Sequence, residues 1–293
     1  MQIIFTATLG RNGSQNLIQI FNRFGNECIG EHEPPDLPLR NLGYRPFFRK
    51  RGWLGPGSRA AMVARNFQRR FVAPDFMVGR GKALEWIDHG DTDKLEWLAN
   101  RRLNRLRRYE KKYRHYLEAS PYFLRTYGHQ TYELRPDLGL IKLTRDPLRN
   151  AKSFVNRQKN IFRNSLPPDH PTNRLRLTDW QQLSKYQLYL HQWFETELRF
   201  REFIETHSVR KTFELTTPDL SNASRMQEMF DYFEIDHLPF SDLSPTNTAS
   251  EHGKQSTKIT AVDISEYEHF LELVPSALLT RINYLHDFIP AEG

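Results

Sequence analysis

Two short apolar segments constrain the fold of this chain most strongly, because each leads through a polar loop into an amphipathic helix. Residues 2–7 and residues 140–143 are apolar runs of strand length. After the first, residues 16–24 carry apolar side chains at helical spacing, and Gly25 ends the pattern. After the second, a helix is predicted from about Leu148. Units of strand, loop and helix are typical of a parallel sheet covered by helices, so we predict an α/β fold.

The rest of the chain continues this alternation. Helices are predicted over residues 179–206, 224–233 (capped by Ser224) and 264–288, a third strand over 211–215 and a polar loop over 239–258. The chain has 293 residues and no internal repeat, which is long enough for a substantial core. We therefore predict a single domain over residues 1–293.

The formal net charge of +7 is concentrated in one stretch of the chain. Residues 40–115 hold 20 Lys and Arg against 7 Asp and Glu, a local charge of +13. This stretch begins in a segment rich in Pro and Gly and ends in a helix predicted over residues 94–117. We therefore predict a basic, largely helical insertion over residues 40–118. Its arginines indicate either a solvated helix face beside acidic neighbours or a docking surface for an anionic substrate.

The loop after the first predicted strand has the residues of an anion site. From Thr8 to Gln15 it reads T-L-G-R-N-G-S-Q. Glycines allow close approach of the backbone, and the first N–H groups of a helix favour a negative charge. Arg11 adds a cation and Ser14 a hydroxyl donor. The Walker A pattern G-x-x-x-x-G-K-[ST] is absent, and the same residues also fit a plain turn before a helix.

The loop after the second predicted strand reads T-R-D-P from Thr144 to Pro147. Proline suits the first turn of a helix, and Ser153 follows Arg145 by eight residues. Ligands of open α/β sheets bind at the carboxyl ends of the strands, so both loops are expected at one edge of the sheet. Arg145 and Ser153 would suit a second phosphate there. The alternative is a surface pair of Arg145 with Asp146 and a serine without a ligand.

Taken together, these two loops resemble the donor motifs of the sulfotransferases that use 3′-phosphoadenosine 5′-phosphosulfate (PAPS). The first is similar to the 5′-phosphosulfate loop, in which Lys or Arg precedes Ser-Gly-Thr/Ser-Thr. The second is similar to the 3′-phosphate element, R-[DN]-P with a Ser eight residues after the Arg. Asn12 stands where Ser is usual and Gln15 where Thr is usual, and both can donate hydrogen bonds. The bacterial and carbohydrate-type branch of the family is the most similar.

The resemblance implies transfer of a sulfuryl group from PAPS to a hydroxyl or amine, without a metal ion. Such a transfer is in line and depends on positioning and charge stabilisation. The implied donor-binding residues are Gly10, Arg11, Asn12, Gly13, Ser14, Gln15, Arg145 and Ser153, and Arg11 is also implied in catalysis. The acceptor stays open: a small molecule or glycan, anionic in view of the basic stretch, with carbohydrates and acidic lipids among the possibilities.

A base is needed to take the proton of the acceptor. Some branches of the family place a Glu or His shortly after the first helix, where this chain has Glu31, His32 and Glu33. The Glu-Pro pair at 33 resembles bacterial and carbohydrate members, so the order of preference is Glu33, His32, Glu31. Glu118 and His129 are reserve candidates, and a charged loop without catalytic function is the alternative.

Two other classes of function are alternatives to a sulfotransferase, and the sequence also bears on the location of the protein in the cell. A kinase-like transferase of P-loop ancestry is disfavoured by the missing Walker Lys. A non-catalytic binder of polyanions would rest on the basic stretch alone, and since no DNA- or RNA-binding motif accompanies it, no nucleic-acid partner is expected.

We expect a cytoplasmic protein, since no apolar run reaches the ~20 residues of a membrane span, no signal peptide is evident and Cys28 is the single cysteine. A glycosylation acceptor, Asn12-Gly13-Ser14, would moreover fall inside the first loop.

Overall fold

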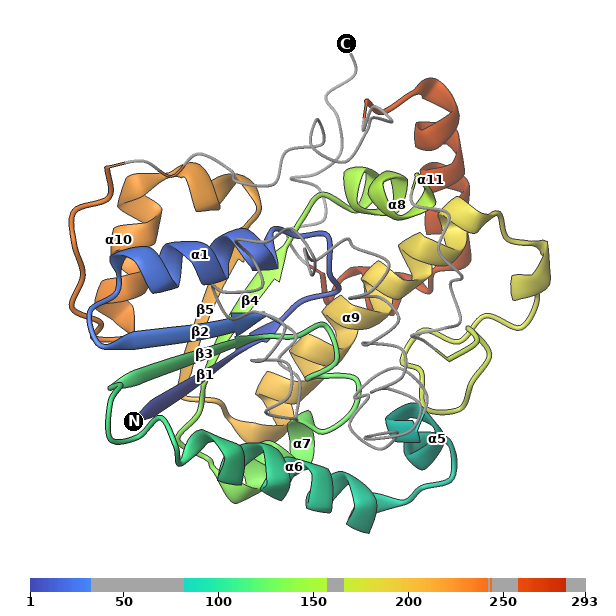
Figure 1. Cartoon of the computed structure of the whole chain (residues 1–293). Helices are drawn as coiled ribbons and strands as arrows, with labels where there is room; N and C mark the ends of the chain where they lie inside the picture. Colours follow the sequence, from blue (N-terminus) through green and yellow to red (C-terminus); the bar gives the residue numbers. More distant parts are fainter. Residues whose placement is uncertain (33–81, 157–165, 242, 244–257, 283–293) are drawn as a thin grey trace, which may run out of the picture.

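A five-stranded parallel sheet forms the centre of the computed structural model, which describes residues 1–32, 82–156, 166–241, 243 and 258–282 (Figure 1). The strand order is β2-β3-β1-β4-β5, and all four neighbouring pairs are parallel. The strands are β1 (Gln2–Ala7), β2 (Cys28–His32), β3 (His115–Ala119), β4 (Gly139–Thr144) and β5 (Lys211–Thr216). The predicted α/β class, a P-loop-like parallel sheet flanked by helices, is confirmed.

Helices cover both faces of this sheet. Figure 1 shows α1 and α10 on one face and α6, α7 and α9 on the other, with α8 and α11 beyond the end of the sheet. Their bounds are α1 Ser14–Phe24, α5 Lys82–Asp88, α6 Thr92–Leu106, α7 Gly128–Leu134, α8 Pro147–Val155, α9 Lys185–His207, α10 Ala223–Tyr232, α11 Ala261–Leu273 and α12 Ser276–Leu279. Two 3₁₀ turns, Trp180–Gln182 and Pro218–Ser221, precede α9 and α10.

The core follows the alternation of side chains along the strands. Phe5 of β1 packs toward α6, α7 and α9, where its ring stacks on Phe123 at a centroid distance of 4.3 Å. Its neighbour Ile4 packs on the opposite face with Phe21 of α1 and Phe230 of α10. A third cluster joins α8, α9 and α11. The sheet is therefore buried on both faces, as parallel sheets require.

The longest helix, α9, fixes the carboxyl edge of the sheet to the outer helices. Its amino end has a capping box, in which Ser184 accepts from the N–H of Gln187 and Gln187 from that of Ser184. The middle of α9 is buried around most of its circumference, because it packs against α8 and α11 and, through Phe200 and Phe203, against the sheet. The helix predicted over 179–206 is confirmed from Lys185 on, since residues 180–182 form a 3₁₀ turn before the cap.

Several boundaries differ from the sequence prediction. The helix predicted over 94–117 ends at Leu106, and residues 115–119 instead form β3, which pairs with β1 and β2. The hydrogen bonds of β3 to strands on both sides outweigh the helical spacing of the apolar side chains before it. β2 and α7 were not predicted. Asn222, not Ser224, caps α10 by accepting from the N–H of Arg225 at 3.2 Å. The loop predicted over 239–258 lies largely outside the described residues.

A buried lysine links β4 to α9. The side chain of Lys142 is only 3% exposed, and its Nζ lies 2.8 Å from Glu197 and 3.2 Å from Glu214. Glu197 also accepts from Thr144 Oγ1 at 2.8 Å. Burial makes such a pair costly to break, because removing one partner leaves an uncompensated charge in the interior.

We expect the substitution Lys142→Met to lower the free energy of unfolding by about 3–5 kcal/mol, because it strands the Glu197 carboxylate. The matched control is Lys211→Met on the adjacent strand, where the ion pair with Glu234 is exposed and contributes about 0–1 kcal/mol. Urea denaturation of both variants measures the difference. Equal losses in the two variants would contradict the structural importance of Lys142.

Candidate functional site

The first loop, residues 8–13, turns the chain sharply between β1 and α1. Gly10, Arg11 and Gly13 have left-handed backbone, with φ values of 101°, 60° and 87°. Glycine adopts this conformation without strain. At Gly13 space is limited as well, because an added Cβ would lie 2.6 Å from Cδ1 of Leu220. Gly13 is therefore required both for the turn and for the packing against the segment after β5.

The amino end of α1 lies at the carboxyl edge of the sheet, since α1 follows β1 directly (Figure 1). No side chain in the described part of the chain caps this helix. Its first N–H groups and its dipole therefore favour an anion at this place. Ser14, the first residue of α1, is buried there, whereas Gln15 is exposed to solvent.

Asn12 holds the first loop in place. Its side chain is 2% exposed and donates to Thr8 Oγ1 at 3.1 Å and to the carbonyl oxygen of Leu143 at 2.9 Å. Its Oδ1 accepts from the Asn150 side chain, and its carbonyl oxygen accepts from Thr217 Oγ1 at 2.9 Å. The side-chain amide of Asn12 thus connects the first loop to β4 and α8, and its backbone carbonyl connects the loop to the segment after β5.

The first loop contacts both the second loop and α8, although more than 130 residues separate them in the sequence. Arg11 Nε donates to Ser153 Oγ at 3.2 Å, and Asn150 Nδ2 donates to the carbonyl oxygen of Gly10 at 3.0 Å. Arg145 donates to the carbonyl oxygen of Arg11 at 3.4 Å. The structure thus brings two guanidinium groups and two serine hydroxyls to one end of the sheet.

The second loop, residues 144–147, leads into α8. Asp146 caps this helix by accepting from the N–H of Leu148 at 2.8 Å, and Pro147 occupies its first turn. Asp146 is therefore held mainly by the backbone. Trp193 of α9 donates to the carbonyl oxygen of Arg145 at 2.8 Å, which fixes the loop from the other side. Partial burial lowers the pKa of Arg145, and arginine stays charged at neutral pH.

Of the candidate bases, His32 lies nearest the first loop. It ends β2, where it pairs in register with Ala119 of β3. Its Nε2 lies 3.1 Å from Ser14 Oγ. Parallel strands place the ends of β2 and β1 at the same edge, so His32 stands beside the amino end of α1. Glu33, the first choice from the sequence, lies outside the described residues.

Glu31 is held by side chains of α6 and β3. Its carboxylate lies 2.6 Å from Arg105 and accepts from the hydroxyls of Tyr109 and Tyr116, both at 2.9 Å. The Arg105 side chain is only 9% exposed. Glu31 is therefore saturated by one cation and two hydroxyls, which disfavours a function as base.

Glu118 lies deeper in the same network. It is 1% exposed, forms an ion pair with Arg102 and accepts from Tyr127 at 2.7 Å. Its Oε2 also lies 3.1 Å from the hydroxyl oxygen of Tyr116, whose single hydrogen is shared between Glu31 and Glu118. Arg102 is itself buried. Two arginines of the basic stretch, Arg102 and Arg105, thus neutralise acids of the sheet, the buried Glu118 and the partly buried Glu31. The docking surface expected there cannot include these two residues.

His129, the other reserve candidate, lies in α7 against the carboxyl end of α9. Its Nδ1 is 2.8 Å from His207 Nε2, and both rings pack against Phe203. Burial, together with the nearby His207, lowers the pKa of His129 to about 4. Tyr132 of α7 packs on the ring of His207 as well. The histidine pair therefore belongs to the packing between α7 and α9.

Residues that the sequence did not single out hold the two loops together. Asn150 contacts both Gly10 and Asn12, and Thr217 and Trp193 fix the loops from β5 and α9. A signal existed for Asn150, because it precedes Ser153 by three residues and so lies on the same face of a helix. For Thr217 and Trp193 the sequence contains no such signal, since their partners are distant in the chain.

Comparisons with known proteins give a distant structural likeness. No family model matches the chain, and no curated protein is significantly similar to it. Among solved structures that match is the sulfotransferase domain from the Synechococcus PCC 7002 olefin synthase, with 15% sequence identity and a TM-score of 0.45. The match covers 100% of this chain and 95% of that domain.

Membrane spans and metal sites are both missing from the described residues. They contain no helix that is both long enough and apolar enough to span a bilayer. Within the same ranges, no three His, Cys, Asp or Glu side chains are grouped so that they could hold a metal ion.

The His129–His207 pair predicts a dependence of stability on pH. Because the pKa of His129 falls from 6.5 in the unfolded chain to about 4 in the fold, unfolding takes up a proton between these values. The contribution of neutral His129 to the free energy of unfolding should therefore be fully present above pH 6.5 and be lost as the pH falls toward 4. The charged groups near the pair are Glu202, Arg174 and Arg199 beside His129 and Glu133 beside His207.

We expect His129→Gln to reduce the slope of unfolding free energy against pH in this window, measured by urea denaturation at half-unit steps. The control is His89→Gln, since His89 is exposed. A slope for His129→Gln identical to that of the unmodified protein would show that the pair does not titrate as described.

Proposed function

We propose that this protein is a sulfotransferase that uses PAPS as its donor. The observation that carries the proposal is the contact of the first loop with the second loop and α8: Arg11 donates to Ser153 Oγ, and Arg145 donates to the carbonyl oxygen of Arg11. The motif resemblance of these loops to the PAPS-dependent family rests on the same residues. Two anion-binding elements at one edge of a sheet suit a nucleotide that carries phosphate groups at both ends of its ribose.

The 5′-phosphosulfate would lie at the amino end of α1. There the backbone N–H groups of the helix start, the guanidinium of Arg11 and the hydroxyl of Ser14 provide donors. Gly10 and Gly13 let the backbone approach the phosphosulfate closely. Asn12 is assigned to holding the loop, because its amide is occupied by Thr8 and Leu143.

The 3′-phosphate would be held by Arg145 and Ser153. A guanidinium can bind two oxygens of a phosphate at once. Ser153 Oγ accepts from Arg11, so its hydroxyl hydrogen can point to another acceptor. This arrangement connects the two ends of the donor, since Ser153 contacts the residue that faces the transferred group.

We assign His32 as the base among the described candidates. In the in-line transfer the acceptor oxygen forms a bond to sulfur, the bond from sulfur to the bridging phosphate oxygen breaks, and the acceptor proton passes to a ring nitrogen of His32. His32 stands beside Ser14, whereas Glu31 and Glu118 are held by arginines and tyrosines. Arg11 would stabilise the charge that develops on the bridging oxygen.

We further propose a cytoplasmic location. A glycan on Asn12, the acceptor of the Asn12-Gly13-Ser14 sequence, is incompatible with an amide that is 2% exposed and hydrogen bonded on both sides. A compartment without N-glycosylation avoids this conflict.

The donor assignment predicts that 3′,5′-ADP stabilises the protein more than 5′-AMP. At ~100 times its dissociation constant, 3′,5′-ADP should add about 2.7 kcal/mol to the unfolding free energy, seen as a thermal shift. Arg145→Ala should weaken the binding of 3′,5′-ADP by about 1.5–3 kcal/mol, because a charge-assisted contact is lost. It should also reduce the preference of the protein for 3′,5′-ADP over 5′-AMP.

The matched control for this experiment is Arg135→Ala. Arg135 precedes β4 and pairs with Asp137, whereas Arg145 follows the same strand. Arg135→Ala should leave the thermal shifts produced by 3′,5′-ADP and by 5′-AMP unchanged. A shift with 3′,5′-ADP no larger than that with 5′-AMP would overturn the donor assignment.

The base assignment predicts that His32→Gln lowers turnover by roughly 10²–10⁴ and leaves 3′,5′-ADP affinity unchanged, because the base acts on the acceptor. Turnover is measured as labelled sulfuryl group transferred from PAPS. The parallel variant is Glu33→Gln, the alternative from the sequence. Full activity of His32→Gln together with an inactive Glu33→Gln would move the assignment to Glu33.

A further inference from the structure

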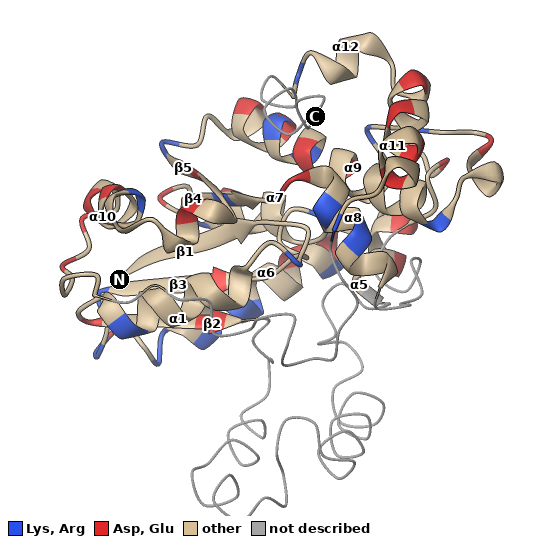
Figure 2. Ribbon diagram, turned by 90° about the horizontal axis from the view of Figure 1, so that it is seen from above, with Lys and Arg blue, Asp and Glu red and all other residues tan. Residues whose placement is uncertain are grey.

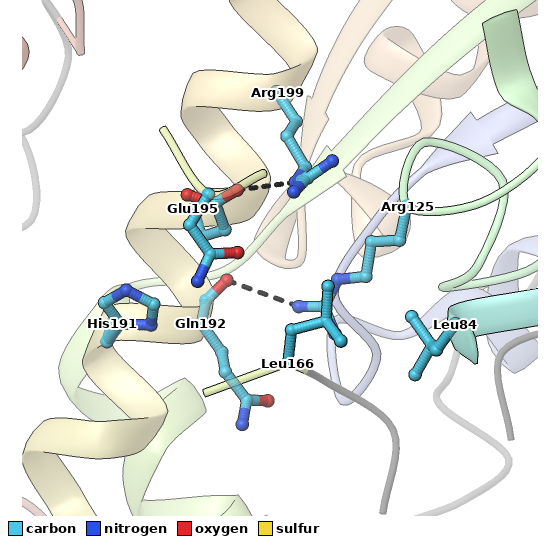
Figure 3. Close-up of a pocket in the computed structure, with 8 residues that line it drawn as sticks. Leu84, Arg125, Leu166, His191, Gln192, Glu195 and Arg199 are labelled. Carbon is cyan, nitrogen blue, oxygen red and sulfur yellow. Dashed lines mark hydrogen bonds and ion pairs between the residues drawn. The ribbon is translucent and has the colours of Figure 1, made fainter. Parts of the chain in front are cut away.

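Clusters of arginine and glutamate inside the described part of the chain differ in what they adjoin. Against α9, Arg199 pairs with Glu195, and Arg125 donates to the same helix (Figure 3). These hydrogen bonds join α9 to its neighbours, so that cluster belongs to the packing. Another cluster is centred on Glu31. It adjoins His32, since the two residues are consecutive in β2.

Glu31 and His32 point to opposite faces of the sheet, as successive residues of a strand do. Glu31 meets the side chains of α6. On the other face, a Cβ added to Gly30 would lie 3.1 Å from Cδ1 of Ile18 in α1, and His32 Nε2 lies 3.1 Å from Ser14 Oγ at the start of that helix. Figure 1 shows α1 and α6 on opposite sides of the sheet. One helix therefore holds Glu31, and the other faces His32.

The carboxyl end of β2 is attached to the sheet on one side only. Among the described strands, β2 has β3 as its single neighbour, and its last residue, His32, pairs with Ala119. Side chains supply the rest of the attachment. On the α1 face, the amide of Asn22 accepts from the N–H of Gly30 at 2.6 Å and donates to its carbonyl oxygen at 3.0 Å. This contact precedes His32 by two residues.

On the α6 face, Glu31 attaches the strand next to His32 itself. Its Oε2 lies 2.6 Å from Arg105, whose side chain is 9% exposed, and its Oε1 accepts from the hydroxyl of Tyr109 at 2.9 Å. Burial and the neighbouring Glu31 raise the pKa of Tyr109, so its hydroxyl keeps the hydrogen that it donates. The ring of Tyr109 stacks on Tyr116 at a centroid distance of 5.9 Å. A carboxylate bonded through both oxygens to packed side chains restrains the backbone at the end of β2.

We propose that Glu31 is a positioning residue for His32, and that Arg105 holds Glu31 in this role. The inference rests on the proposed function, in which His32 is the base. A base must lie within hydrogen-bond reach of the proton that it takes, and a displacement of about 1 Å can lower a rate ~10²-fold. Glu31 acts through the strand that carries His32 and transfers no proton.

The test is a double-mutant cycle of Glu31→Gln with His32→Gln, measured as labelled sulfuryl group transferred from PAPS. Glu31→Gln keeps the size of the side chain, and the charge of Arg105 stays compensated by Glu118, whose Oε2 lies 3.9 Å away. We expect Glu31→Gln to lower kcat by up to ~10²-fold and to leave the KM for PAPS unchanged. Added to His32→Gln, it should cause no further loss, because a residue that acts through His32 then has nothing to position.

A second measurement needs no activity. In protein labelled with ¹³C-histidine, the ring signal of His32 is identified by its absence in His32→Gln. Ser14→Ala should shift this signal, because the contact of Ser14 Oγ with His32 Nε2 is lost. In a chain that already carries Glu31→Gln, the same substitution should shift the signal far less, since the ring no longer lies beside Ser14.

The matched control is Glu27→Gln, at the other end of β2. The side chain of Glu27 is 60% exposed, and its nearest cation, Arg114, lies 3.8 Å away. This variant should leave kcat unchanged, and Ser14→Ala should shift the His32 signal as it does in the unmodified chain.

Two milder variants serve if Glu31→Gln does not fold. Tyr109→Phe removes one hydroxyl from Glu31 and keeps the ring, and Arg105→Lys keeps the charge without the planar fork. Each should lower kcat several-fold and lose this effect in combination with His32→Gln.

Losses of turnover that multiply in the double variant overturn the proposal, because Glu31 then acts independently of His32. An unchanged kcat in Glu31→Gln overturns it as well, and so does a response of the His32 signal to Ser14→Ala that is the same with and without Glu31. The two proposals fail separately. If the unmodified protein transfers no sulfuryl group from PAPS, the sulfotransferase assignment is rejected, and the His32 signal still decides whether Glu31 positions His32.

Discussion

The carboxyl edge of the sheet depends on one buried amide, that of Asn12. Its hydrogen bonds to Thr8, Leu143 and Asn150 join the first loop to β4 and α8, and none of these partners is adjacent to it in the sequence. A buried amide that lost one partner would carry the full cost of an unpaired polar group, so the connections stand or fall together. The left-handed turn at Gly10 and Gly13, and with it the position of Arg11, follows from this attachment.

Charge in this protein is used inside the fold as well as on its surface. Arg102 and Arg105 neutralise Glu118 and Glu31, and Lys142 connects β4 to α9. Figure 2 shows acidic residues along α11 beside the basic α8, and Lys152 of α8 pairs there with Asp263 at 2.8 Å. A positive stretch in the sequence therefore overstates the positive charge available to a partner, because its neighbours in space are not its neighbours in the chain.

The sequence predicted those parts of the structure that local patterns determine. The elements at residues 2–7, 140–143 and 211–215 were recognised as strands, and α1, α8 and α9 as helices, because apolar periodicity and flanking turns suffice for them. The start of β3 was mistaken for the end of a helix, because the apolar side chains up to Tyr113 keep helical spacing and the pairing of β3 with β1 and β2 leaves no local signal in the sequence. The short motifs located two loops that follow neighbouring strands of one parallel sheet and therefore meet at its carboxyl edge. The sequence could not separate Glu31 from His32, because what distinguishes them is the ion pair of Glu31 with Arg105, a residue distant in the chain.

The second loop is held in place by the longest described helix rather than by its own residues. On α9, Trp193 donates to the carbonyl oxygen of Arg145 at 2.8 Å, and Glu197 binds Lys142 and Thr144 of β4. The same helix is held by the buried core around Phe123 and Phe203. The second loop therefore cannot shift without breaking buried contacts along α9, and the position of Arg145 beside the carbonyl oxygen of Arg11 is set by packing outside both loops.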